Sequence, residues 1–214
     1  MRQILVYADS LSWGIIPDSR RRFRFDQRWP GVMELELIKK GLSVRVIEDC
    51  LNGRRTVWED PIKPGRRGMS DIEQRIEINS PLSLVILFLS TNDFQSDLHN
   101  NAWQSAQGVG ALIKAVRRAP IEPGMPIPEI IVVAPPTIQK AKGTIAPKFL
   151  GAEVKAAGLA GNIQKITTEN NCYFFNAGSV TETSEVDGVH LDEEQHLLLG
   201  KALALFISKI KLSN

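Results

Sequence analysis

The stretch Leu84-Val85-Ile86-Leu87-Phe88-Leu89 decides the fold. Its six consecutive apolar residues are too few to cross a membrane, for which about 20 are needed. A short apolar run of this kind is typical of a strand that is buried on both faces. Such a strand lies in a sheet with helices on either side, so the run predicts an α/β protein.

Further strands and helices surround this run on both sides. Short apolar runs predict strands at residues 4–7, 44–47, 130–133 and 173–175. Helical patterns cover residues 30–41, 71–78, 102–118, 153–170 and 193–210. Alternation of strands and helices is typical of a parallel sheet that is covered on both faces. Because no linker separates two cores, we predict one three-layer α/β domain over residues 1–214, with a five-stranded parallel sheet.

Composition restricts the classes of partner. The chain has 214 residues, of which 43% are hydrophobic and 23% charged, as in an ordinary globular protein. Its net charge of +2 is too small to indicate binding to nucleic acid or to an anionic membrane. The basic run Arg20-Arg21-Arg22-Phe23-Arg24 fits either a nucleic-acid arm or a solvated loop. The loop is favoured because no basic helix or aromatic platform accompanies the run, so we expect neither a nucleic-acid nor a membrane partner.

The two cysteines point to a reducing compartment. Cys50 and Cys172 lie far apart, and no Cys-x-x-Cys or Cys/His cluster suggests a zinc site. The apolar stretch Ile4–Tyr7 is too short for the core of a signal peptide. We therefore expect a cytoplasmic protein that needs no metal or other cofactor.

A serine and a histidine at opposite ends of the chain suggest acyl-transfer chemistry. Ser10 follows the first predicted strand, and Asp187-Gly188-Val189-His190 lies near the other end. A serine needs a base within hydrogen-bond reach, and the base needs a partner on its other ring nitrogen. An Asp-x-x-His sequence also occurs by chance, usually as a turn before a surface helix. The pair is therefore a hypothesis that depends on the rest of the chain.

Other polar residues follow predicted strands in the same way. Asn52-Gly53 comes after the second strand and Asn92 after the third. In a parallel sheet, ligands bind beyond the carboxyl ends of the strands. The sequence thus predicts that these residues meet Ser10 and His190 in one crevice.

Four sequence blocks, in order, resemble those of the SGNH hydrolases, also called GDSL esterases. They are Ala8-Asp9-Ser10-Leu11-Ser12-Trp13-Gly14, Asn52-Gly53, Ser90-Thr91-Asn92-Asp93 and Asp187-Gly188-Val189-His190. Together they extend over nearly the full chain. The segment from Asn52 to Pro61 is further similar to the bacterial arylesterase and acetyl-xylan-esterase-like branch.

The resemblance implies a flavodoxin-like fold and a serine esterase that acts on short, acetyl-type carboxylic esters. Ser10 would be the nucleophile, His190 the base and Asp187 its orienter. The oxyanion hole would combine the Ser10 and Gly53 backbone N–H groups with the Asn92 side-chain amide. The partner would be a small-molecule ester, and the arylesterase-like members favour a homo-oligomer.

The chain departs from the family pattern at two positions. Ala8 and Ser90 stand where the family usually has glycine. Neither substitution removes a nucleophile, a base or a hydrogen-bond donor. The departures therefore affect the expected turn geometry rather than the expected class of reaction.

Several other residues have two interpretations. Trp13 and Trp58 fit a substrate-binding role and simple packing equally well. Asp93 is expected to hold the turn around Asn92, and His196 to lie on the surface of the last helix.

Rival functions are few. No Gly-x-Ser-x-Gly elbow and no phosphate-binding loop occur in the chain. The alternative is a non-catalytic carbohydrate- or acyl-ligand-binding module that retains the fold. A complete nucleophile, base and oxyanion set argues against that alternative, because binding alone needs no nucleophile.

Overall fold

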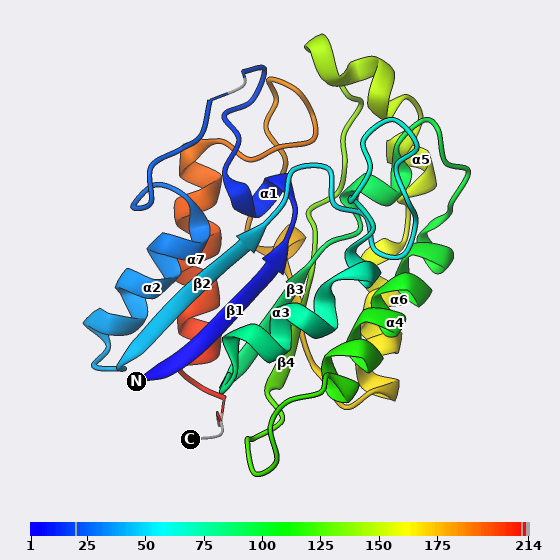
Figure 1. Ribbon diagram of the computed structural model, residues 1–214. Coiled ribbons are helices and arrows are strands. Elements are labelled where there is room, and N and C mark those ends of the chain that lie inside the picture. The colour runs from blue at the N-terminus through cyan, green and yellow to red at the C-terminus, as the bar shows by residue number, and fades with distance from the viewer. Residues whose placement is uncertain (20, 211, 213–214) are drawn as a thin grey trace.

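A computed structural model describes residues 1–19, 21–210 and 212, so that Arg20 of the basic run lies outside the described residues (Figure 1). Five strands form one parallel sheet in the order β2-β1-β3-β4-β5. The strands are β1 (Arg2–Ala8), β2 (Val44–Cys50), β3 (Leu84–Phe88), β4 (Glu129–Ala134) and β5 (Tyr173–Asn176). All five predicted strands are confirmed, and so is the parallel sheet.

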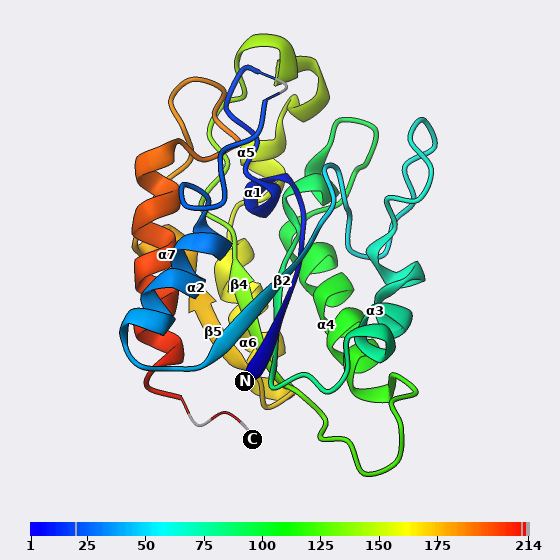
Figure 2. The same ribbon diagram turned by 60° about the vertical axis from the view of Figure 1, so that its left-hand side comes forward.

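Helices cover both faces of the sheet, which confirms the three-layer prediction (Figure 1, Figure 2). The α-helices are α1 (Ser10–Trp13), α2 (Trp29–Lys39), α3 (Ile72–Asn79), α4 (Ala102–Arg118), α5 (Ala152–Lys155), α6 (Leu159–Glu169) and α7 (Glu193–Ile207). Helices α2 and α7 pack on one face, and α3, α4 and α6 on the other. Short 3-10 helices occupy η1 (Gly68–Ser70), η2 (Thr91–Phe94), η3 (Gly143–Phe149) and η4 (Ala177–Ser179).

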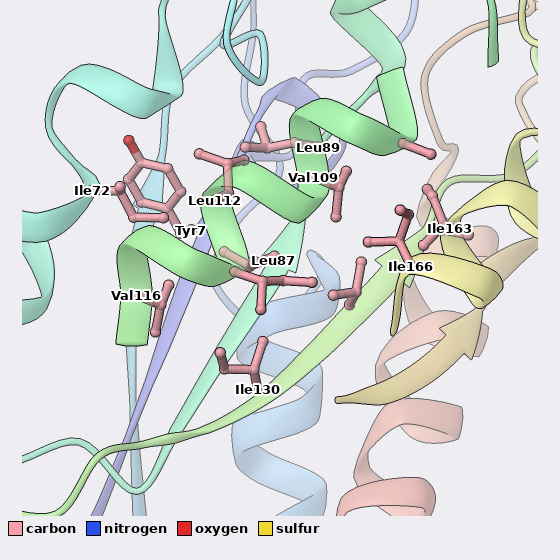
Figure 3. Close-up of a cluster of buried hydrophobic side chains, with 14 of the residues drawn as sticks. Tyr7, Ile72, Leu87, Leu89, Val109, Leu112, Val116, Ile130, Ile163 and Ile166 are labelled. Atoms are coloured by element: carbon pink, nitrogen blue, oxygen red, sulfur yellow. The ribbon is translucent and has the colours of Figure 1, made fainter. Parts of the chain in front are cut away.

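Strand β3 contributes side chains to both hydrophobic cores, as its unbroken apolar run predicted. Leu84, Ile86 and Phe88 point toward the core under α2 and α7. Val85 and Leu87 point to the opposite core, under α4 and α6 (Figure 3). Successive side chains of a strand alternate between its faces, so every residue of β3 is buried. This central strand therefore holds the two helical layers together.

Strand order fixes where a site can form. From β1 the chain crosses to β2 on one side, whereas β3 pairs with β1 on the other side. Such a reversal leaves a crevice at the carboxyl ends of the two inner strands, β1 and β3. Ser10 follows β1 directly, and Asn92 follows β3. The fold thus brings two of the predicted site residues to the same crevice.

The predicted helix over residues 153–170 was wrong in its continuity. The segment forms the single turn α5 and then the separate helix α6. Gly158, between them, has φ +81°, a left-handed conformation that ends a helix and that glycine adopts readily. The 3-10 helix η3, over residues 143–149, was not predicted, because its sequence lacks a helical pattern of apolar residues. Within the described part of the chain, no helix is long and apolar enough to span a membrane.

Candidate active site

Ser10, His190 and Asp187 meet at the carboxyl edge of the sheet. The Nε2 atom of His190 lies 3.2 Å from Ser10 Oγ, and its Nδ1 atom lies 2.6 Å from Asp187 Oδ2. All three side chains are buried or nearly so. The prediction that residues 180 positions apart converge is therefore confirmed in its geometry.

The turn that carries His190 also carries Asp187. Asp187 Oδ1 accepts hydrogen bonds from the backbone N–H groups of Val189 and His190, both at 2.9 Å. Gly188 has φ +76°, and a Cβ there would lie 2.7 Å from the carbonyl oxygen of Lys140. Only glycine fits that close approach, so the turn needs glycine both for its own conformation and for its packing against the backbone at Lys140.

Opposing effects act on the pKa of Asp187. Burial favours the neutral carboxyl, but hydrogen bonds from the His190 ring and from two backbone N–H groups favour the carboxylate. The hydrogen bonds prevail and hold the pKa of Asp187 below its ordinary value. A carboxylate therefore faces the Nδ1 atom of His190.

Ser10, the predicted nucleophile, lies in the first turn of α1. Asp9 is the N-cap of this turn, and its Oδ1 accepts from the Leu11 N–H at 3.0 Å. The Ser10 N–H precedes the first intrahelical hydrogen bond. Within the described residues it donates to no protein acceptor, and it is free to face a ligand.

Gly53 provides a second free N–H group. It has φ +84°, and a Cβ at this position would meet only the Arg66 side chain, at 3.8 Å. Backbone conformation rather than space therefore calls for glycine. No described acceptor bonds the Gly53 N–H, and Gly53 lines the same cavity as Ser10.

The Asn92 amide is fixed at both ends. Its Nδ2 donates to Asp9 Oδ2 at 3.0 Å, and its Oδ1 accepts from Gln95 Nε2 at 2.6 Å. Since an amide nitrogen carries two hydrogens, one remains for the cavity that Asn92 lines. Burial raises the pKa of Asp9 to about 7, although the Leu11 and Asn92 hydrogen bonds oppose the rise.

Asp93 lies beneath this turn, as expected for a structural residue. Its carboxylate accepts from the Thr56 N–H, the Thr56 hydroxyl and the Ser105 hydroxyl, at 2.9, 2.8 and 2.6 Å. Burial raises the pKa of Asp93 to about 6, and these hydrogen bonds limit the rise. Asp93 thereby joins the turn after β3 to the loop that carries Gly53.

Two arginines that the sequence analysis gave no role anchor the same loop. The Arg54 guanidinium donates to the carbonyl oxygen of Ala8 at 3.0 Å and stacks over Tyr7, 3.9 Å from the ring centre. Arg55 is 1% exposed and donates to Gln95 and Asp97. Arg54 also pairs with Asp49, and Arg55 also donates to the Glu59 carbonyl oxygen. Their place directly after Asn52-Gly53 was the available signal, but their contacts with Ala8, Gln95 and Asp97 join residues 40 or more positions apart.

A cavity of about 220 Å³ opens onto these groups. Ser10, Gly53, Asn92, Asp187 and His190 all line it. Other lining residues come from three loops: Ile15, Asp18, Ser19, Asn52, Lys63, Thr144, Ile145, Lys148 and Phe149. Among the residues that the structure describes, no group of three His, Cys, Asp or Glu side chains is placed to hold a metal ion.

Neither Trp13 nor Trp58, for which a substrate-binding role was one of two interpretations, lines this cavity. The Arg22 guanidinium covers the Trp13 ring, 4.8 Å from its centre. Trp58 packs against α4, where a Cβ on Gly108 would lie 3.3 Å from its ring. Both tryptophans are half-buried and contact protein groups outside the cavity.

His196 was predicted to be on the surface but is fully buried. Its Nδ1 accepts from the Trp29 N–H at 3.2 Å, and its ring meets Phe23 edge-on at 5.4 Å. Burial lowers the pKa of His196 to about 3, which keeps the ring neutral. The prediction was wrong because α7 packs along α2, so that a polar helix position points to a neighbouring helix rather than to water.

The two departures from the family pattern differ in conformation. Ser90 has φ +101°, and its buried hydroxyl has no partner in the described structure. Ala8 is the last residue of β1, is fully buried and has no such conformation. Only Ser90 thus occupies a backbone that favours glycine.

Comparisons with known proteins agree with this geometry. The aryl esterase of M. smegmatis is 32% identical, with a TM-score of 0.93 over 99% of this chain and 100% of that one. Est24, a carbohydrate acetylesterase from Sinorhizobium meliloti, is 31% identical, with a TM-score of 0.91 over 97% and 99%. The chain belongs to the SGNH hydrolase family.

Membership makes the chain a carboxylic ester hydrolase of the GDSL type. A lipase/acylhydrolase from Enterococcus faecalis shares the fold, at a TM-score of 0.67 and 17% identity over the full length of both chains. No family model matches the sequence, and a search of curated proteins finds no match. Family membership therefore rests on solved structures that align with nearly the full length of this chain.

Proposed function

We propose that this SGNH hydrolase cleaves short-chain, acetyl-type esters through an acyl-enzyme. Ser10 attacks the ester carbonyl while His190 accepts the hydroxyl proton, and Asp187 holds the imidazole in the required tautomer. His190 then protonates the departing alcohol, and water releases the acid by the reverse sequence. The observation that carries the proposal is the continuous contact from Ser10 Oγ through the His190 ring to Asp187.

Three donors support stabilisation of the oxyanion. The Ser10 and Gly53 N–H groups have no acceptor in the described chain, and Asn92 has one amide hydrogen to spare. All three residues line one cavity. Donors aimed at the developing charge are typically the largest single contribution to acyl transfer.

Cavity size supports a small acyl group. A space of about 220 Å³ is smaller than the roughly 300–1,000 Å³ of pockets for drug-sized ligands. The similar structures named above are an aryl esterase and a carbohydrate acetylesterase, which agrees with acetyl transfer to water.

Release of p-nitrophenol from p-nitrophenyl acetate tests the proposal. Wild-type protein should hydrolyse this ester, and Ser10→Ala should lower kcat by about 10⁴-fold or more. Ser12→Ala is a matched control, because Ser12 lies in the same turn and bonds Trp29 instead of His190. Equal activity of wild type and Ser10→Ala would favour the non-catalytic binding module.

We also propose a cytoplasmic location and a homo-oligomeric state. Both cysteines are free thiols, which fits a reducing compartment. Leu150 and Val154, beside the cavity-lining segment η3, expose 75% and 74% of their surface, which fits an interface between subunits. Light scattering on the purified protein measures the mass, and a monomer would contradict the oligomer.

A further inference from the structure

Two lysines of the cavity have no place in the hydrolytic mechanism. Lys63 comes from the loop between β2 and η1, and Lys148 comes from η3. In the described structure, neither ammonium group makes a hydrogen bond or an ion pair. Both side chains nevertheless line the space in front of Ser10. The mouth of the site therefore holds two positive charges that protein groups leave unpaired.

The backbone fixes the positions of both lysines. The Lys63 N–H donates to Asp60 Oδ1 at 2.9 Å. The Lys148 carbonyl accepts from the Ser96 N–H at 2.8 Å, which ties η3 to the chain that follows Asn92. These bonds hold the main chain at both positions, while the two side chains line the cavity and remain exposed to solvent.

Neighbouring carboxylates are engaged elsewhere. Asp97 pairs with Arg55 at 2.8 Å, and Asp60 lies 3.7 Å from the same guanidinium. Asp18, which also lines the cavity, accepts from the Thr144 hydroxyl of η3 at 3.3 Å. These acids reduce the positive potential, but none of them forms an ion pair with Lys63 or Lys148.

The two ammonium groups are close enough to repel one another. Desolvation lowers the pKa of Lys148, and the Lys63 charge lowers it further, although Asp60 acts in the opposite direction. An anion in the cavity would offset both the repulsion and the desolvation. Asp18 and Asp187 also line the cavity, but the part of it beside Lys63 and Lys148 is better suited to a negatively charged group than to a neutral one.

We propose that Lys63 and Lys148 select esters that carry a carboxylate. The inference rests on the proposed esterase function and names the class of substrate for that site. The carboxylate belongs either to the acyl group or to the alcohol, and in both cases the lysines bind it while Ser10 attacks the ester carbonyl.

Two pairs of esters separate these sources. In the alcohol pair, p-acetoxybenzoate is compared with its methyl ester. In the acyl pair, mono-p-nitrophenyl succinate is compared with p-nitrophenyl methyl succinate, after spontaneous hydrolysis has been subtracted. The measured quantity is the ratio of kcat/KM for the charged ester to that for the neutral ester. Because each ratio is compared between variants, differences in leaving group cancel.

In one of the two pairs, Lys148→Met and Lys63→Met should each lower this ratio by about three- to tenfold, as expected for a partly solvated ion pair. Lys148→Arg should restore most of the ratio. Raising the ionic strength from about 0.05 M to about 0.5 M should lower the wild-type ratio in the same pair. Lys40→Met serves as the control, because it removes the same charge. Lys40 is exposed at the end of α2, on the opposite edge of the sheet.

Ratios that stay within about twofold of wild type in both pairs, for both methionine variants, would overturn the inference while leaving the esterase intact. An equal loss in Lys40→Met would also overturn it, because net charge alone would then be the cause. If wild type hydrolyses neither the charged nor the neutral esters, the proposed function fails, and this inference fails with it.

Discussion

The two sides of the cavity are built in different ways. On one side, Asp187 and His190 lie within a single turn, and Asp187 binds both the ring and the backbone of that turn. On the other side, Asn92 depends on Asp9, 83 residues away, and on Gln95. Asp93 joins that side to Thr56 across 37 residues. The side that carries the proposed base, which we call the acid–base side, thus holds its carboxylate and its ring within one turn. The side that carries the proposed oxyanion donor Asn92, which we call the oxyanion side, is a long-range network.

This difference predicts how each side fails. A conservative substitution in a turn can abolish catalytic activity without changing the fold, because the backbone contacts of the turn survive. A substitution in a buried network lowers both activity and stability, because each removed partner leaves another polar group unsatisfied. Substitutions on the acid–base side should therefore affect mainly rate, and those on the oxyanion side both rate and stability.

The largest effect is expected for Asp187→Asn. The remaining amide oxygen can still accept from the backbone of Val189 and His190, but an NH₂ group would face Nδ1 and stabilise the wrong tautomer. We expect kcat/KM for p-nitrophenyl acetate to fall by about 10⁴-fold, with little change in the thermal midpoint. A variant that unfolds at a much lower temperature would show that this side is not independent of its surroundings.

Asn92→Ala comes next. The lost donor acts mainly on the transition state, so kcat should fall by about 10²- to 10³-fold and KM much less. Unlike Asp187→Asn, this change also leaves Asp9 Oδ2 and Gln95 Nε2 without their partner. The free energy of unfolding should therefore fall by about 1–3 kcal/mol.

A matched control is Gln95→Met, which removes the contact to Asn92 Oδ1 but leaves the donor. It also removes an acceptor of Arg55, which keeps its bonds to Asp97. It should lower stability at least as much as Asn92→Ala and kcat much less. A destabilised Asn92→Ala protein with nearly normal kcat would remove Asn92 from the oxyanion hole.

Asp93 sharpens the comparison through pH. Its pKa is raised from 3.8 to about 6 in the folded protein, so folding favours the protonated carboxyl. This contribution is fully present below about pH 4 and is lost as the pH rises through about 6. Asp93→Asn should be less stable than wild type, because an amide cannot accept all three hydrogen bonds. The stability gap measured by urea unfolding should narrow between about pH 4 and pH 7; a gap that widens would contradict the assignment.

The smallest effect concerns Ser90. Glycine would remove a left-handed conformation and a buried hydroxyl without a partner. Even after the extra entropy of the unfolded chain, Ser90→Gly should raise the free energy of unfolding by about 1 kcal/mol. Ala8→Gly provides the contrast, because Ala8 has ordinary strand geometry. This substitution should lower the free energy of unfolding by about 0.5–1 kcal/mol. Equal effects at the two positions would mean that conformation does not distinguish them.

The sequence predicted the fold well where the signal is local. Strand β3 is an uninterrupted apolar run, and α4 begins and ends at the predicted residues, Ala102 and Arg118. The break at Gly158 was missed because the helical period continues across it. His196 was wrongly predicted to be on the surface, because the sequence of α7 alone does not show that α7 packs against α2.

The site shows the same division. The contact between the Asp187 carboxylate and the His190 ring lies within four residues, so the sequence predicted it, although the same turn also packs against the backbone at Lys140. No sequence pattern near Arg54 or Arg55 predicts their contacts with Ala8 and Asp97, because these contacts exist only after the sheet has formed. Trp13 and Trp58 were ambiguous for a related reason, since only the folded loops decide which rings face a cavity.

The distance in sequence between Ser10 and His190 also has a consequence in time. The contact between their side chains spans 180 residues, and α7, which follows His190, completes one face of the core. During synthesis Ser10 is made 180 residues before His190. A nascent chain that has not yet extended past α7 should therefore lack the proposed esterase activity, and the appearance of activity would report that α7 has packed.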